Sequence, residues 1–185
     1  MDIKEGQSFP DFTLKSDSGE EVSLSDLKGK TSIIYFYPKD DTPGCTKEAC
    51  SFRDNINSFQ SIGVPVFGVS VDSVESHKKF KEKYSLPFTL LSDSDKKLVT
   101  KLKIKSLIGF ASRVTFILDK DGKVLKIYPR CLRTNMLRRY WLFSGKTSSK
   151  FYKERELVIL RLSRDRPRLG FGPRPRGPQP LVLPG

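Results

Sequence analysis

Two cysteines, Cys45 and Cys50, lie five residues apart in a segment that directly follows the apolar run 33–37. That run is rich in β-branched and aromatic residues and predicts a buried strand, Pro43 and Gly44 indicate a turn, and the following residues are typical of helix. Cys45 is therefore expected at a helix start. There the unpaired backbone N–H groups and the helix dipole stabilise a thiolate, which favours a nucleophilic cysteine.

A helix start alone is too weak to ionise this thiol. An ordinary thiol, with a pKa of about 8.5, is only a few per cent ionised at neutral pH. Ionising most of it requires roughly 2.7 kcal/mol of thiolate stabilisation, whereas a helix terminus contributes about 0.3–1 kcal/mol. We therefore expect a cation or a further donor beside the sulfur. Arg113 is the candidate cation, and the Thr42 hydroxyl is the candidate donor.

The spacing of the cysteines limits how they react with each other. On a continuous helix their Cα atoms lie roughly 9 Å apart, but disulfide-bonded Cα atoms normally lie within about 7 Å. If the pair bonds during turnover, the first turns of the helix must unwind and re-form, and Gly44 lowers the cost. We expect a folded reduced conformation and a locally unfolded oxidised one.

These residues resemble the active-site segment of the peroxiredoxins, whose pattern of Pro, three residues, Thr, two residues and Cys is matched by Pro38, Thr42 and Cys45. A second cysteine five positions later in the same helix is similar to the Q type, also called bacterioferritin comigratory proteins. The resemblance extends from about residue 3 to residue 129. Its further motifs are Phe9-Pro10-Asp11-Phe12, Leu27-Lys28-Gly29-Lys30, Phe67-Gly68-Val69-Ser70 and Arg113-Val114-Thr115-Phe116.

The resemblance implies an α/β thioredoxin-like fold, with a central mixed β-sheet flanked by helices, and a thiol peroxidase without cofactor or metal. Cys45 would be the peroxidatic residue, whose thiolate reduces a hydroperoxide and becomes a sulfenic acid. Cys50 would be the resolving residue, which condenses with that acid to an intramolecular disulfide. A thioredoxin-like reductant would reduce this disulfide by exchange. The resemblance also implies a monomer.

Further positions match the family residue by residue. Those matching Thr42 and Arg113 bind the peroxide oxygens and stabilise the departing oxygen, the one matching Pro38 shields the thiolate, and Glu48 matches another active-site position. From the residues alone, Thr42 is equally consistent with a helix cap and Arg113 with a surface charge. For His77, in the charged run 75–79, we expect a solvent-exposed helix face rather than catalysis.

Other interpretations of the cysteines also stay open on the residues alone. Free cysteines are often small buried core residues. A structural zinc site lacks a second ligand pair, since only Cys131 and His77 remain. Thiol–disulfide exchange without peroxide chemistry usually uses cysteines separated by two residues. We assign no role to Cys131.

Length and hydropathy set the outer bounds. A chain of 185 residues fits one domain with an appendage. We find no N-terminal apolar region suited to a signal peptide, and no apolar run near the length of about 20 residues that spans a membrane. We therefore expect a cytoplasmic protein without a membrane partner. In that reducing compartment a close cysteine pair is more often catalytic than structural.

The residue pattern also predicts the elements that position Cys45. After the central strand over 32–37, the reactive helix is expected to run to about Ile62 and to end at Gly63. Asp72 or Ser73 is the expected cap of a later helix. The remaining predicted elements are a hairpin over 11–25, a strand over 64–71, a helix over 74–84, a strand at 90–91, a helix over 95–102 and a hairpin over 113–128.

The composition changes sharply near Pro129. Nearly all of the net charge of +13 comes from the residues that follow, where Arg replaces Lys as the main cation. We divide the chain into a thioredoxin-like domain, 1–129, and an aberrant basic, Arg/Pro-rich low-complexity tail, 130–185. We expect that tail to be poorly ordered and to arise from a shifted reading frame or an unrelated extension. The alternative function is a redox-linked nucleic-acid-binding protein acting through it, but few aromatic residues interleave its arginines, so nucleic acid is not the expected partner.

Overall fold

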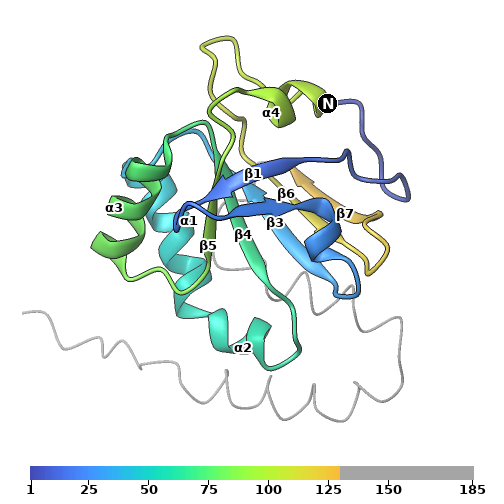
Figure 1. Cartoon of the computed structure of the whole chain (residues 1–185), viewed down its shortest axis with the longest axis horizontal. Helices are drawn as coiled ribbons and strands as arrows, with labels where there is room; N and C mark the ends of the chain where they lie inside the picture. Colours follow the sequence, from blue (N-terminus) through green and yellow to red (C-terminus); the bar gives the residue numbers. More distant parts are fainter. Residues whose placement is uncertain (130–185) are drawn as a thin grey trace, which may run out of the picture. The chain divides into compact units, whose positions relative to one another are not determined.

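The computed structural model describes residues 1–129, which form a mixed sheet flanked by helices (Figure 1). The seven strands have the order β2-β1-β5-β4-β3-β6-β7. In chain order the elements are β1 Thr13–Ser16, β2 Glu21–Ser23, the 3-10 helix η1 Leu24–Leu27, β3 Ser32–Phe36, α1 Pro43–Asp54, α2 Ile56–Gln60, β4 Val66–Ser70, α3 Val74–Tyr84, β5 Thr89–Ser92, α4 Lys97–Lys101, β6 Val114–Leu118 and β7 Val124–Pro129. The predictions for residues 130–185, including Cys131, lie outside the described residues.

Strand β3 is the predicted interior strand, and all five of its residues are buried. It pairs in parallel with β4 and antiparallel with β6. Parallel pairing joins β3, β4 and β5, so the loops that follow these three strands leave from the same edge of the sheet. One of those loops leads from Phe36 to α1, and therefore positions Cys45.

The two faces of β3 enter different parts of the core, because successive side chains alternate. Ile34 and Phe36 join the apolar cluster that contains residues of η1 and α4. Tyr35 points to the opposite face and stacks on Phe52 of α1, with 4.5 Å between ring centroids. A Cβ on Gly68 of β4 would lie 2.7 Å from the Tyr35 hydroxyl, so the Tyr35 side chain fits against β4 only because residue 68 is glycine. Aromatic packing thus docks α1 on the sheet.

The prediction of one helix from Cys45 to Ile62 is wrong. Helix α1 ends at Asp54 and α2 begins at Ile56. Between them Asn55 has φ −113° and ψ 7°, and its side-chain amide donates to the Ser51 carbonyl at 2.8 Å. Such side-chain bonds compete with helical bonds and explain the break. Helix α2 ends at Gln60, two residues before the predicted end at Ile62, and Gly63 follows with the left-handed φ of +68° that is typical of a glycine after a helix.

Helix α4 is shorter than the predicted span 95–102. It begins at Lys97 because Lys96 has a left-handed φ of 59°. The Asp93 carboxylate accepts the N–H groups of Leu98 and Val99, at 3.1 and 2.8 Å, and so caps this short helix from four residues before its start.

Of the two predicted caps of α3, Ser73 is confirmed, since its hydroxyl accepts the Ser76 N–H at 3.3 Å.

Candidate active site

Cys45 is the third residue of α1, as the sequence predicts, and its side chain is buried. Thr42 is the N-cap residue, with an extended backbone, and Pro43 is the first helical residue. The Thr42 hydroxyl makes no capping bond but donates to the Lys39 carbonyl at 3.2 Å. Thr42 is therefore the N-cap through its backbone alone, and its hydroxyl makes its bond within the loop that precedes α1.

Arg113 is the cation beside the sulfur. Its Nη2 donates to the Cys45 Sγ at 3.0 Å, although 68 residues separate the two in sequence. Arg113 directly precedes β6, whose first residue, Val114, pairs with Phe36 at the end of β3. Antiparallel pairing thus brings the start of β6 to the loop that leads to α1. The alternative of a surface charge is wrong, because the Arg113 side chain is only 18% exposed.

Glu48 lies one helical turn after Cys45 and holds the other end of the guanidinium. Arg113 Nη1 donates to Glu48 Oε2 in a buried ion pair. Burial raises the pKa of Glu48 to about 7, and the neighbouring Arg113 only partly offsets that rise. A Cβ on Gly44 would lie 2.9 Å from Arg113 Nη2, so glycine at this position allows the guanidinium to approach the helix.

Cys50 is half-buried on the same unbroken helix, and neither it nor Cys45 is in a disulfide. Helix geometry places the two Cα atoms roughly 9 Å apart, too far for a bond. This matches the folded reduced conformation expected from the spacing. Pro38 lies two residues after the end of β3 and is half-buried, and its shielding role stays a prediction.

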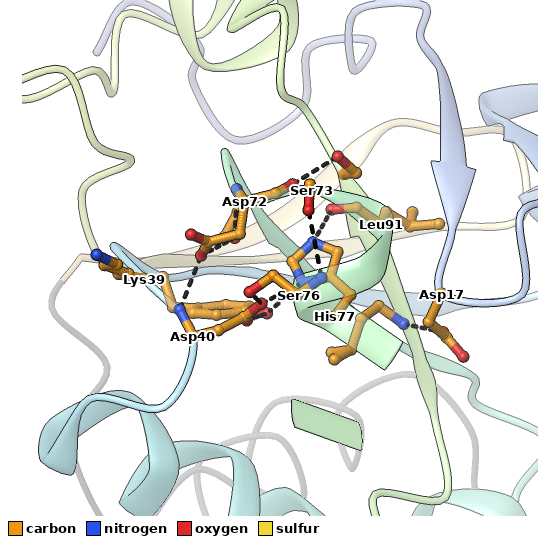
Figure 2. Close-up of polar contacts among 12 residues, drawn as sticks. Asp17, Lys39, Asp40, Asp72, Ser73, Ser76, His77 and Leu91 are labelled. Carbon is orange, nitrogen blue, oxygen red and sulfur yellow. Dashed lines mark hydrogen bonds and ion pairs between the residues drawn. The ribbon is translucent and has the colours of Figure 1, made fainter. Parts of the chain in front are cut away.

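The expectation for His77 is wrong. This side chain is completely buried, and its Nδ1 lies 2.8 Å from Asp40 Oδ2 (Figure 2). Sequence reasoning also missed Asp40, a second buried polar residue. A signal was present, because His77 and Phe80 are three residues apart and form the buried face of α3. The charged neighbours of His77 obscured that face.

Within residues 1–129, no three His, Cys, Asp or Glu side chains are grouped so as to hold a metal ion. No helix in the same range is long and apolar enough to cross a membrane. The candidate site brings together a buried sulfur at a helix start, a guanidinium bonded to it, a carboxyl that holds the guanidinium, and a second cysteine on the same helix. This arrangement is that of a thiol-dependent peroxidase.

Comparison with known proteins identifies the family. The AhpC/TSA family model matches residues 6–127. The chain is 50% identical over 137 residues to a putative peroxiredoxin Bcp of Coxiella burnetii, covering 70% of this chain and 91% of that protein. It is 52% identical over 134 residues to peroxiredoxin Bcp of Bacillus subtilis, covering 68% and 85%. The chain therefore belongs to the AhpC/TSA family, as a peroxiredoxin of the Q, or Bcp, type.

Solved structures agree. Peroxidoxin BcpB of Mycobacterium tuberculosis superposes with a TM-score of 0.72 at 31% identity, covering 80% of this chain and 99% of that one. A peroxiredoxin Q of Xanthomonas campestris has a TM-score of 0.68 at 29% identity, covering 74% and 92%. The thioredoxin-like fold and the peroxidase activity are thereby confirmed, with hydroperoxides as substrates and a thiol as reductant. The family likeness does not support the nucleic-acid-binding alternative.

Proposed function

We propose that Cys45 is the peroxidatic residue and Cys50 the resolving residue of this peroxidase. The observation that carries the assignment is the 3.0 Å bond from Arg113 Nη2 to the Cys45 sulfur. The thiolate attacks the terminal oxygen of a hydroperoxide, and the S–O bond forms as the O–O bond breaks. The sulfur keeps the terminal OH as a sulfenic acid, and the departing oxygen takes a proton from solvent and leaves as water or alcohol. The resulting sulfenic acid condenses with the Cys50 thiol, which forms the disulfide and releases water.

Arg113 supports this reaction by its position beside the reacting sulfur. In the ground state it donates to the sulfur, and in the transition state the negative charge moves toward the departing oxygen within reach of the same guanidinium. Glu48 holds that guanidinium in place. We assign the Thr42 hydroxyl to the peroxide, after it turns away from the Lys39 carbonyl, and Pro38 to shielding the thiolate.

We also propose which hydroperoxides the protein reduces, which reductant recycles it, and its oligomeric state and compartment. A Xanthomonas campestris bacterioferritin comigratory protein, 29% identical, was solved in connection with its alkyl peroxide reduction activity, which favours alkyl hydroperoxides beside hydrogen peroxide here. We propose a thioredoxin-like dithiol as reductant, because exchange with a dithiol regenerates both cysteines. We also propose that the protein is a cytoplasmic monomer and that it has no nucleic-acid or membrane partner.

Stopped-flow reaction of the reduced protein with hydrogen peroxide tests the assignment. We expect Cys45→Ser to abolish the reaction, and Cys50→Ser to keep the first step but accumulate a sulfenic acid that a dimedone-type probe labels. Non-reducing mass analysis of the wild type should show one intramolecular disulfide. Rapid peroxide consumption by Cys45→Ser, or an unchanged disulfide in Cys50→Ser, would contradict the assignment.

A further inference from the structure

The loop between β3 and α1 is held by buried polar side chains that the peroxide chemistry above does not use. The Asp40 carboxylate accepts the Tyr37 hydroxyl at 2.7 Å on Oδ1, and the Ser76 hydroxyl at 2.7 Å on Oδ2. His77 Nδ1 lies 2.8 Å from the same Oδ2. The Asp40 side chain is 4% exposed and that of His77 is 0% exposed. We call Tyr37, Asp40, Ser76 and His77 the Asp40 cluster.

The backbone of Asp40 is fixed as well. Its N–H donates to Asp72 Oδ2 at 2.7 Å, and that oxygen also accepts the Ser70 hydroxyl at 2.8 Å. The Asp72 carbonyl in turn accepts the Ser92 hydroxyl at 2.5 Å. The loop is therefore bonded to the ends of β4 and β5, the strands beside β3 on one side of the sheet, as Figure 2 shows for Asp40 and Asp72.

His77 links this loop to the sheet through both of its ring nitrogens. Nδ1 faces the Asp40 carboxylate, and Nε2 lies 3.2 Å from the Leu91 carbonyl of β5. Burial raises the pKa of Tyr37 well above its ordinary value, so its hydroxyl stays protonated and donates to Asp40. Each bond of the cluster is at least partly buried, and removing one partner leaves a polar group of the cluster unsatisfied.

The residue after Asp40 shows why such anchoring matters. Asp41 has a left-handed φ of 52°, a conformation that costs a non-glycine residue roughly 1 kcal/mol or more. It persists because the preceding residue, Asp40, is held by the buried cluster, whereas the bonds from Lys83 and Tyr84 of α3 to the Asp41 carboxylate are exposed and contribute little. Thr42, the N-cap of α1, follows immediately, so a relaxed Asp41 backbone shifts the helix start.

We propose that His77 is a positioning residue for the peroxidase reaction. Through Asp40 it fixes the loop that begins α1, and so places the Cys45 sulfur against Arg113. The proposal rests on the peroxidatic role of Cys45 stated above. We further infer that this loop stays in place while the first turns of α1 unwind to form the disulfide. The helix can then re-form at the same position.

The test separates the two steps of turnover. In a Cys50→Ser background, we expect His77→Gln to lower the second-order rate constant of Cys45 oxidation by hydrogen peroxide about 10- to 100-fold, since a displacement of about 1 Å can have that effect. With Cys50 present, we expect disulfide formation from the sulfenic acid to be unchanged or faster, because that step requires unwinding.

Lys81→Met is the matched control. Lys81 lies on the same helix, α3, but pairs with Asp17 in the β1–β2 turn at 2.5 Å and does not contact Asp40. This variant loosens α3 without touching the cluster, so we expect a Cys45 oxidation rate within twofold of the parent. An equal slowing by Lys81→Met would overturn the proposal, and so would an unchanged rate in folded His77→Gln.

If His77→Gln does not fold, Ser76→Ala provides the decisive measurement. It removes one donor from Asp40 with little change in volume, and we expect a several-fold slower oxidation step. An unchanged rate in folded Ser76→Ala would then refute the role of the cluster. If Cys45 were not the peroxidatic residue, Cys45→Ser would still react with peroxide. That result does not depend on the His77 variants, so it can be told apart from a failure of the His77 proposal.

Discussion

The start of α1 and the loop just before it are adjacent in sequence but held in place very differently. Among residues 1–129, the Cys45 sulfur accepts a hydrogen bond from Arg113 alone. Asp40 is bonded through both carboxylate oxygens and its backbone N–H, and every bond is at least partly buried. The start of α1, which is proposed to unwind, thus has few side-chain bonds at its reactive cysteine, whereas the loop that is proposed to guide its return is held by several.

Such a division has a physical basis. Local unfolding is cheapest where few buried bonds must break, and Gly44 further weakens the first turn of α1. A loop with a buried, multiply bonded carboxylate costs much more to release, because each broken bond leaves an unsatisfied group. Variants that affect only one of the two regions therefore test whether the regions are held so differently.

The largest effect is expected at Arg113. Arg113→Ala removes the only donor to the Cys45 sulfur that we identify among the described residues, and loss of such a charge-stabilising donor typically costs about 10²–10³ in rate. Stopped-flow oxidation by hydrogen peroxide measures it. Arg53→Ala is the matched control: Arg53 lies at the other end of the same helix, where it pairs with Asp54 and donates to the Tyr84 carbonyl, and the variant should stay within about threefold of wild type.

Gly44→Ala should have the next largest effect. The added Cβ would lie 2.9 Å from Arg113 Nη2, so we expect the guanidinium to shift and the oxidation rate to fall about tenfold. In an Arg113→Ala background the same substitution should cost almost nothing, because the clashing partner is absent. Additive effects of the two substitutions would show that Gly44 acts through helix flexibility alone.

Glu48→Gln should alter the pH dependence of stability. The folded pKa of Glu48, about 7, lies above its ordinary value of 4.5 because the carboxyl is buried. The folded state therefore binds this proton more tightly, and its contribution to stability, full below about pH 4.5, is lost as pH rises through about 7. We expect the free energy of unfolding of wild type minus that of the variant to fall by about 3 kcal/mol over this range. Urea unfolding at a series of pH values measures this difference. A difference that does not change with pH would contradict the raised pKa of Glu48.

The smallest effect is expected at Lys83, which also reaches the loop but at the protein surface. Its ion pair with Asp41 is exposed on both sides, and such pairs are screened by solvent and salt. Lys83→Ala should leave the melting temperature and the peroxide rate unchanged within error. A clear loss of rate would mean that the exposed tether, rather than the Asp40 cluster, positions the loop.

Much of the site was predictable because its signals are local. The apolar run before Cys45 and the Pro and Gly that follow it predict a strand, a loop and a helix start, and the structure has all three, although Pro43 and Gly44 are the first two helical residues rather than a turn. Arg113 was identified from its place before a strand and from the family pattern, and it lies beside the sulfur. The break of the reactive helix at Asn55 was not predictable from helical pattern alone, since it depends on a side-chain bond to Ser51.

The sequence by itself determined that a cysteine stands at a helix start, that a second one follows too closely along the helix to bond without unwinding, and that the chain is a peroxiredoxin. Only the tertiary structure decided that His77 is buried against Asp40 and that Arg113 holds both Cys45 and Glu48. The reason is physical: helix starts and residue spacing are set by neighbours in the chain. Burial and hydrogen-bond partners are set by which distant strands and helices pack together.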